Sequence, residues 1–257
     1  MDVQAQEEVH RIWDEISDFD TSRSEEAARH LLTRLCDLGG AWNATWAGAI
    51  RVGGANADDP LAGWRVGAVQ ALHAAGSLPD EGHFKEILRI WDRREIDVSF
   101  LLPLRDVGTF RTYSLRRDLP PDWFSSPFYE AYYGSVGTHD AVFVAFPMNG
   151  DCESHLGFYS RNTFTDEEIA LLAYAARGIK WFHRHLMLSH GLLMASAPLT
   201  PAERKVLQLL LTDASEKHIA HQAEIAASTA HQHVVNIYRK FGVRSRAGLM
   251  SLWLSRR

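Results

Sequence analysis

The stretch LTPAERKVLQLLLTDASEKHIAHQAEIAASTAHQHVVNIYRKFGVRSRAGLMSLW, residues 199–253 of this 257-residue chain, decides the fold of the C-terminal part. It opens with a Thr/Glu capping box and a Pro at the first helical position, in residues 200–203. Ser215 and Ser245 predict the starts of two further short helices. Residues 226–241 predict a longer helix with one buried stripe, because apolar residues recur at helical spacing. The stripe consists of Ala230, Val234, Ile237 and Phe241. Residues 198–257 therefore predict an all-α domain of four helices.

This stretch resembles the LuxR-type helix-turn-helix family along its whole length. The matching residues are Leu199-Thr200-Pro201, Glu203-Arg204, Val206-Leu207, Ser215, Lys217, Ile219-Ala220, Thr229, Asn236-Ile237-Tyr238-Arg239-Lys240 and Gly242-Val243-Arg244-Ser245-Arg246. The resemblance implies a DNA-binding module whose third helix enters the major groove and reads base edges.

The resemblance also implies a set of DNA-binding residues. The base-reading positions of the family fall on His231, Gln232 and Val235. Gln232 can bond adenine in two places, and Val235 can touch a thymine methyl group. The positions that meet phosphates in the family fall on Lys217, Thr229, Asn236 and Lys240. Arg239 lies on the same exposed face and completes the predicted DNA-binding set.

Three residues depart from the family pattern. Glu224 stands where the family usually has Gly in the turn, and it predicts a strained left-handed backbone there. Ala226 replaces the usual Ser or Thr cap of the third helix, a loss of about 1 kcal/mol. His231 replaces a common Lys, so the predicted groove-facing surface is less basic. These departures leave open an alternative: a protein-interaction or signal-binding module with a degenerate, weakly DNA-binding helix-turn-helix domain.

Residues 1–190 predict one α+β domain with a mainly antiparallel sheet and flanking helices. The strand candidates are 42–52, 64–72, 98–104, 110–115, 141–148 and 155–160, and the last two flank a predicted Asn149-Gly150 hairpin turn. Helical spacing predicts helices over 5–16 and 81–94, and one long helix over 165–190. Another helix is predicted to start at a Ser22/Glu25 capping box, to bury Ala28, Leu31, Leu32 and Leu35, and to end at Gly39-Gly40. This coarse order resembles the GAF and PAS sensor domains. A second resemblance, to acyl-homoserine-lactone (autoinducer) sensors, stays open beside it.

Aromatic residues are frequent in this predicted sensor domain. Five of them are predicted to line a pocket for an apolar or aromatic ligand: Trp42, Trp46, Trp64, Tyr113 and Tyr132. The alternative for each is plain packing in the core. The small, mixed residues 191–197 predict a linker to the DNA-binding domain at 198–257.

Charge divides the chain in the same place. Residues 198–257 hold nine Lys/Arg against four Asp/Glu, or +5, and the remainder holds 18 against 28, or −10. A basic module on an acidic body is typical of nucleic-acid binding. Two widely spaced cysteines predict a reduced, cytoplasmic setting, and no apolar run predicts a membrane span. No nucleophile elbow, phosphate loop or metal-ligand run is visible, so no enzyme activity, cofactor or metal is predicted.

Together these features predict a DNA-binding transcription regulator of the LuxR type. Its predicted partners are double-stranded DNA, a second copy of itself as a homodimer, a small-molecule ligand in the N-terminal domain, and RNA polymerase. A quorum-sensing receptor of the acyl-homoserine-lactone type is the narrower alternative.

Overall fold

The computed structural model describes residues 3–52, 59–73, 89–90, 93, 96–194 and 197–254. The chain forms two compact units: Met1–Ile16 with Arg29–Lys180, and Ser17–Ala28 with Trp181–Arg257. The predicted domain limits, 1–190, 191–197 and 198–257, stay a prediction. The compact units differ from them by assigning residues 17–28 and 181–190 to the C-terminal unit.

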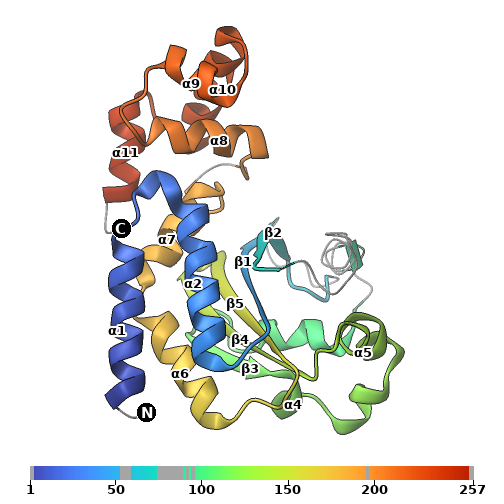
Figure 1. Ribbon diagram of the computed structural model, residues 1–257. Helices are drawn as coiled ribbons and strands as arrows, with labels where there is room; N and C mark the ends of the chain where they lie inside the picture. Colours follow the sequence, from blue (N-terminus) through green and yellow to red (C-terminus); the bar gives the residue numbers. More distant parts are fainter. Residues whose placement is uncertain are drawn as a thin grey trace. The chain divides into compact units, whose positions relative to one another are not determined.

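The first unit is built on a five-stranded antiparallel sheet in the order β2-β1-β5-β4-β3 (Figure 1). The strands are β1 (Asn43–Arg51), β2 (Trp64–Ala71), β3 (Arg111–Ser114), β4 (Asp140–Asn149) and β5 (Cys152–Ser160). The short helices between them are η2 (Val98–Leu104), α4 (Leu115–Asp118), η3 (Pro121–Ser125), α5 (Pro127–Tyr132) and η4 (Gly134–Val136). The predicted α+β class with an antiparallel sheet is confirmed.

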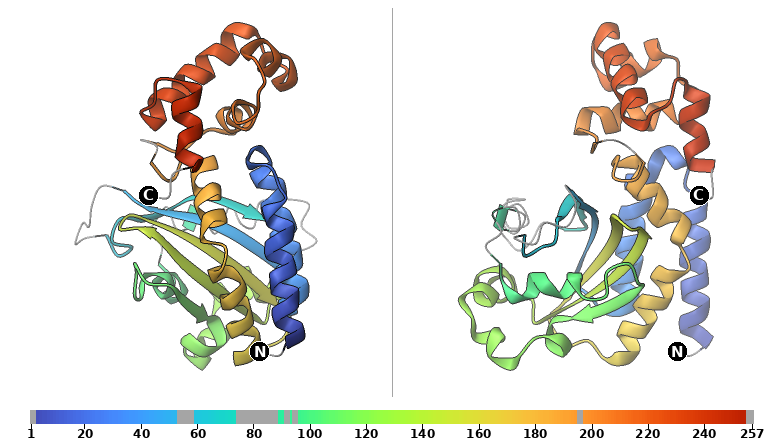
Figure 2. Two further views of the ribbon diagram at one scale, coloured as in Figure 1. Left: turned by 90° about the vertical axis from the view of Figure 1, so that its left-hand side faces the viewer. Right: turned by 180° about the vertical axis from the view of Figure 1, so that it is seen from behind.

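Three helices cover one face of this sheet: α1 (Val3–Ser17), α2 (Ser24–Gly39) and α6 (Asp166–Arg177) (Figures 1 and 2). Their apolar stripes are buried, including Ile12, Leu31 and Leu172 at 0–1 % exposure. The capping box predicted at Thr165 and Glu168 is present at the start of α6. Among the described elements, η2 and α5 lie over the opposite face, where Ser99, Phe100 and Tyr132 line a cavity with the sheet.

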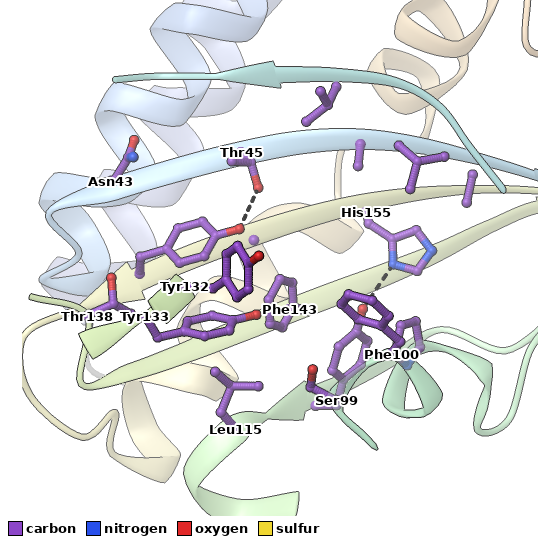
Figure 3. A pocket seen from close by; sticks show the side chains of 18 of the residues that line it. Asn43, Thr45, Ser99, Phe100, Leu115, Tyr132, Tyr133, Thr138, Phe143 and His155 are labelled. Atoms are coloured by element: carbon purple, nitrogen blue, oxygen red, sulfur yellow. Dashed lines mark hydrogen bonds between the residues drawn. The ribbon is translucent and has the colours of Figure 1, made fainter. Parts of the chain in front are cut away.

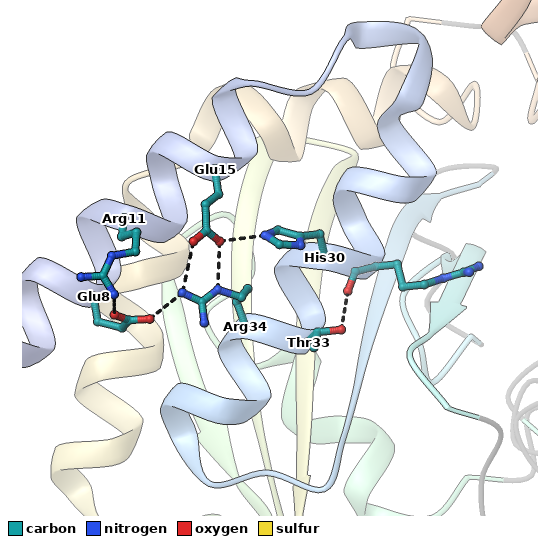
Figure 4. Close-up of polar contacts among 7 residues, drawn as sticks. Glu8, Arg11, Glu15, His30, Thr33 and Arg34 are labelled. Atoms are coloured by element: carbon teal, nitrogen blue, oxygen red, sulfur yellow. Dashed lines mark hydrogen bonds and ion pairs between the residues drawn. The ribbon is translucent and has the colours of Figure 1, made fainter.

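An ionic network joins α1 to α2 within this unit (Figure 4). The Arg34 guanidinium donates to Glu8 at 2.5 Å and to Glu15 at 2.9 Å. His30 also contacts Glu15, at 2.7 Å. The hydrogen bond from Arg34 has the largest effect and lowers the pKa of the Glu15 carboxyl; burial opposes this, and His30 lowers the pKa further. Two carboxylates of α1 thus bind Arg34 of α2 and hold the two helices together.

The predicted strand at 98–104 is wrong, because these residues form the 3-10 helix η2. Pro103 has no N–H to donate to a strand ladder. Asp97 caps the helix by accepting from the Ser99 N–H at 2.8 Å. This local capping bond selects the helix over the extended chain that the apolar run suggested.

The predicted single helix over 165–190 is also wrong. It is divided into α6 and α7 (Lys180–Ser189) at Gly178 and Ile179. The Trp13 ring lies against Gly178 so closely that a Cβ there would be 2.1 Å from a ring carbon. Trp13 Nε1 also donates to the carbonyl of Ala175 at 2.8 Å. A glycine is required for this close approach, and glycine also weakens a helix interior.

The predicted hairpin is confirmed, but its turn is not the predicted one. Gly150 and Asp151 occupy the loop, since Asn149 already pairs with Cys152. Gly150 does not adopt a positive φ, so the Asn-Gly turn argument fails. Instead the Asn149 side chain accepts from the Asp151 N–H at 2.8 Å, which is the local bond of an Asx turn. Most of the helix predicted at 81–94 lies outside the described residues.

The second unit is helical. It contains η1 (Thr21–Arg23), most of α7, α8 (Pro201–Leu210), α9 (Glu216–Ala223), α10 (Ala227–Phe241) and α11 (Arg246–Leu254). The four helices predicted at 198–257 are present, with the capping box at Thr200 and the Ser215 cap. All four residues of the predicted α10 stripe are buried, at 0–6 % exposure. Arg246 fixes the α8–α9 connection by donating to the carbonyls of Leu210 at 2.8 Å and Ala214 at 2.5 Å.

Candidate DNA-binding face and ligand cavity

The exposed face of α10 carries the predicted base-reading residues. Val235 is 44 % exposed at its middle, unusual for a valine in a folded domain. Beside it, Gln232 Nε2 donates to Asn236 Oδ1 at 3.2 Å, and Arg239 donates to the same oxygen at 3.1 Å. Thr229 is exposed one turn earlier. The face is therefore polar, with one apolar contact point at its centre.

The preceding helix contributes to the same region. Lys217 of α9 is exposed, as the family resemblance implies. The carboxylate of Glu216, its neighbour, accepts a hydrogen bond from His231, with 2.9 Å between Nδ1 and Oε2. A base contact by His231 therefore competes with this bond. The sequence did not predict that Glu216 belongs to this surface.

Lys240 is placed differently from the other predicted phosphate contacts. Its Nζ donates to Glu203 Oε2 at 2.6 Å and to the carbonyl of Pro198 at 2.9 Å. Burial would raise the pKa of Glu203, but Lys240 and the Thr200 cap outweigh it and lower the pKa. Lys240 thus holds α10 to the start of α8, so its replacement would disturb the packing of the domain.

The turn between α9 and α10 has the strain that the sequence predicts. Glu224 adopts φ 57° and ψ 43°, the left-handed region, and its N–H closes the end of α9. Ala226 stands at the N-cap of α10, where no side chain accepts from the helix. Both departures from the family pattern therefore have local energetic costs.

Glu224→Gly should raise the unfolding free energy of the C-terminal domain by about 1 kcal/mol, because glycine adopts the left-handed region without a Cβ clash. Glu224→Ala is the matched control: it also removes the carboxylate but keeps the clash. Urea unfolding of both variants measures the difference. Equal stabilities for the two would show that backbone strain is not the cause.

A cavity of about 180 Å³ lies between the sheet and the short helices η2 and α5 (Figure 3). Aromatic side chains form most of its walls: Trp42, Trp64, Phe100, Tyr113, Tyr132, Tyr133, Phe143 and Tyr159. Four of the five predicted pocket aromatics are among them. Trp46 is not, because it points to the other face of the sheet, where its Nε1 donates to Ser154 Oγ at 2.9 Å.

A buried polar cluster stands at one side of this cavity. Glu153 is 2 % exposed. Its carboxylate accepts hydrogen bonds from the two terminal nitrogens of Arg111, at 2.8 and 2.9 Å, and from the Gly108 N–H at 2.8 Å. His155 Nε2 lies 3.2 Å from the same carboxylate, and His155 Nδ1 lies 3.3 Å from the Tyr113 hydroxyl. The carboxylate is therefore fully bonded and its charge is balanced by Arg111.

The stability of the first unit should fall in acid because of Glu153. Burial by itself raises the pKa of this carboxyl, but the bonds from His155, Arg111 and Gly108 lower it to about 2. The unfolded value is near 4.5, so the contribution is complete above that pH and is lost as pH falls from there to about 2. Urea unfolding against pH measures this, with Glu153→Gln expected to flatten the dependence in that window. An unchanged profile in Glu153→Gln would contradict the assignment.

Further hydroxyl groups line the cavity away from this cluster. Thr45 Oγ1 and the Tyr159 hydroxyl bond each other at 3.3 Å. Ser99 Oγ and Thr138 Oγ1 are buried with no hydrogen-bond partner in the part of the chain that the structure describes. The sequence prediction missed Ser99, Thr138, Glu153 and His155. The alternation of residues 153, 155, 157 and 159 in β5 is the signal that would have placed the last two on the pocket face.

Residues 197–253 match the family model of bacterial regulatory proteins, luxR family. The chain is 31 % identical over 97 residues to the transcriptional regulatory protein MctR of Rhizobium johnstonii. That alignment covers 37 % of this chain and 45 % of MctR, so it spans less than half of that relative. Residues 197–253 form a LuxR-type helix-turn-helix domain, as their sequence predicts, and DNA is the partner that such a domain implies.

A solved structure shares the fold. SdiA in complex with octanoyl-rac-glycerol superposes with a TM-score of 0.50 and 13 % identity, over 98 % of this chain and 95 % of that one. Escherichia coli SdiA in the space group P6522 gives a TM-score of 0.45 and 15 % identity, over 95 % and 94 % of the two chains. The VqsR ligand-binding domain of Pseudomonas aeruginosa gives 0.47 and 14 %, over 73 % of this chain and 98 % of that one. The fold of SdiA replaces the looser GAF/PAS label. Within the described residues, no helix has the length and apolar character needed to cross a bilayer.

Proposed function

We propose that this chain is a LuxR-type transcription regulator whose DNA binding responds to a small molecule held in the N-terminal cavity. The observation that carries the proposal is the LuxR-type domain at 197–253, with an exposed and polar α10 face. The cavity between the sheet and η2 supports the ligand response. Such a regulator acts where bacterial DNA is, in the cytoplasm, and no catalytic role is proposed.

DNA readout is proposed for the exposed face of α10. Gln232 and Val235 read base edges, while Lys217, Thr229 and Arg239 contact the backbone. Asn236 orients Gln232 and Arg239 through the two bonds it accepts. His231 can contact DNA once its hydrogen bond to Glu216 is broken. Lys240 can contact a phosphate once its bond to Glu203 is broken.

Binding to duplex DNA should weaken steeply with salt, because each neutralised phosphate releases a counterion. The logarithm of affinity should fall by about 0.9 per phosphate contact for each tenfold rise in salt. Fluorescence anisotropy of a labelled duplex with the full chain, at several salt concentrations, measures this slope. Lys217→Ala should reduce the slope by about one contact. Absence of any binding at low salt would contradict the proposal.

A homodimer is the proposed DNA-bound form. Twofold DNA readers place two recognition helices about one duplex turn apart. In α11, Leu249 and Trp253 are buried inside the unit, whereas Met250 and Leu254 are 37 % and 83 % exposed and four residues apart. These two exposed side chains share one helix face and are the proposed dimer contact. RNA polymerase is also a proposed partner, and the support for it is that transcription regulators as a class act on that enzyme.

Two alternatives keep specific support. The strained Glu224, the uncapped Ala226 and the Glu216 carboxylate beside His231 favour a weakly DNA-binding module that acts through other contacts. An acyl-homoserine-lactone receptor is compatible with the SdiA fold. Restoring Gly at 224 and Ser at 226 discriminates the first alternative: if these changes create DNA binding that the natural chain lacks, the degenerate-module reading stands.

A further inference from the structure

The chemistry of the cavity walls defines the kind of molecule that it accepts, and this inference rests on the proposed ligand response. We propose that the cavity takes an uncharged, ring-sized, mainly apolar molecule with two hydroxyl-type groups, one bound by Ser99 and the other by Thr138. Three observations carry the proposal: the charge balance of the walls, two buried hydroxyl groups without partners, and the cavity volume.

The walls favour an uncharged ligand. Among the described lining residues, Glu153 is the one carboxylate, and no Lys or Arg side chain faces the cavity. Arg111, the Gly108 N–H and His155 already occupy that carboxylate. A ligand cation would find no free counter-charge, and an anion would lie near a carboxylate. Burial of an unpaired charge is strongly unfavourable, so the charged members of any ligand series are excluded.

Two hydroxyl groups in the walls have no hydrogen-bond partner among the described residues. Ser99 Oγ and Thr138 Oγ1 are buried, with their residues 7 % and 2 % exposed, and Trp42 Nε1 is a third lining atom without a partner in this part of the chain. Buried polar groups are normally bonded, and one that is not costs free energy. Ser99 belongs to η2 and Thr138 precedes β4, and Figure 3 shows them apart on the cavity wall. A ligand that satisfies both therefore needs polar groups at separate ends.

The volume and the aromatic walls set the size and body of the ligand. The cavity of about 180 Å³ is close to the engineered protein cavity of about 150 Å³ that binds benzene. Tyr133 lies between the two hydroxyl groups, and Tyr132 and Phe100 add aromatic surface to the wall (Figure 3). Aromatic rings pack favourably against an apolar ring. A single ring with two polar substituents fits the volume and the aromatic walls and offers one polar group to each hydroxyl.

A matched set of four ring compounds tests this with the full-length chain and without DNA. 1,4-Benzenedimethanol has two hydroxyl groups, 4-methylbenzyl alcohol has one and p-xylene has none. The fourth compound, 4-methylbenzoate, carries a negative charge. Dissociation constants come from ligand-observed NMR at millimolar concentrations. The protein variants are Ser99→Ala and Thr138→Val. Thr45→Val is the control, since it removes a cavity hydroxyl that already has Tyr159 as its partner.

We expect Ser99→Ala and Thr138→Val each to weaken 1,4-benzenedimethanol about three- to tenfold, the size of one hydrogen bond, and to leave p-xylene unchanged. Thr45→Val should not distinguish the two compounds, and 4-methylbenzoate should bind at least tenfold more weakly than 4-methylbenzyl alcohol. Equal weakening of diol and xylene, tight benzoate binding, or no binding by any compound would each overturn the proposal. Because DNA is absent, these outcomes leave the DNA-binding part of the proposed function to its own test.

Discussion

Val235→Asp should lower the affinity for DNA by about ten- to a thousandfold. Val235 is 44 % exposed at the centre of the α10 face, between Gln232 and Arg239 in sequence. A carboxylate there would face phosphates at a distance where like charges repel by about 1–4 kcal/mol, depending on the local dielectric. The side chain is outside the core, so the unfolding free energy should change by no more than about 0.5 kcal/mol.

Met194→Asp is the matched control for this substitution. Met194 is also an exposed apolar residue of the same unit, at 52 %, but it lies on neither α10 nor α11. Anisotropy titrations of a labelled duplex with each variant give the two affinities. Equal losses of affinity would mean that added negative charge anywhere on the unit weakens binding, and α10 would lose its special role.

Arg111→Met should lower the unfolding free energy of the first unit by about 3–5 kcal/mol. The Arg111 side chain is 10 % exposed and holds Glu153, 2 % exposed, with two charge-assisted hydrogen bonds. Removal of one member of a buried ion pair leaves the other charge buried without a partner. The free-energy cost of that unpaired charge is larger than the net stabilisation that the intact pair provides. Urea unfolding of the full-length chain near neutral pH measures the loss.

Two comparisons isolate the cause of that loss. Arg51→Met removes an arginine whose partner, Asp151, is 3.7 Å away and 70 % exposed, so it should cost about 0–1 kcal/mol. The double variant Arg111→Met with Glu153→Gln should recover part of the stability, because no buried charge is left unpaired. If Arg111→Met costs no more than Arg51→Met, the Glu153 cluster is not a structural centre of the unit.

The C-terminal domain was predictable because its signals are local. The capping box at Thr200, the Ser215 cap and the four-three-four stripe of α10 each fix one helix from neighbouring residues. The strain at Glu224 was predictable from the family resemblance, since the family usually has Gly at that position of the turn, and Glu224 does adopt φ 57°. What the sequence did not reveal in this domain depends on contacts across helices, such as Glu216 with His231.

The cavity was only partly predictable, because its lining comes from residues far apart in the chain. Aromatic content pointed to Trp42, Trp64, Tyr113 and Tyr132, but Trp46 belongs to the opposite face of β1. Strict alternation along β1 would have separated Trp46 from its neighbours at 43, 45 and 47. Ser99 was missed since its segment was predicted to be a strand. Likewise, the break after α6 depends on the Trp13 ring, over 160 residues away in sequence.

Selection from a random duplex pool tests the central claim most directly. The full-length chain at low salt should enrich one near-palindromic sequence with half-sites about one duplex turn apart. Val235→Asp, run in parallel, should enrich none. Failure of the natural chain to enrich any sequence, or equal enrichment by both chains, would contradict DNA reading through α10.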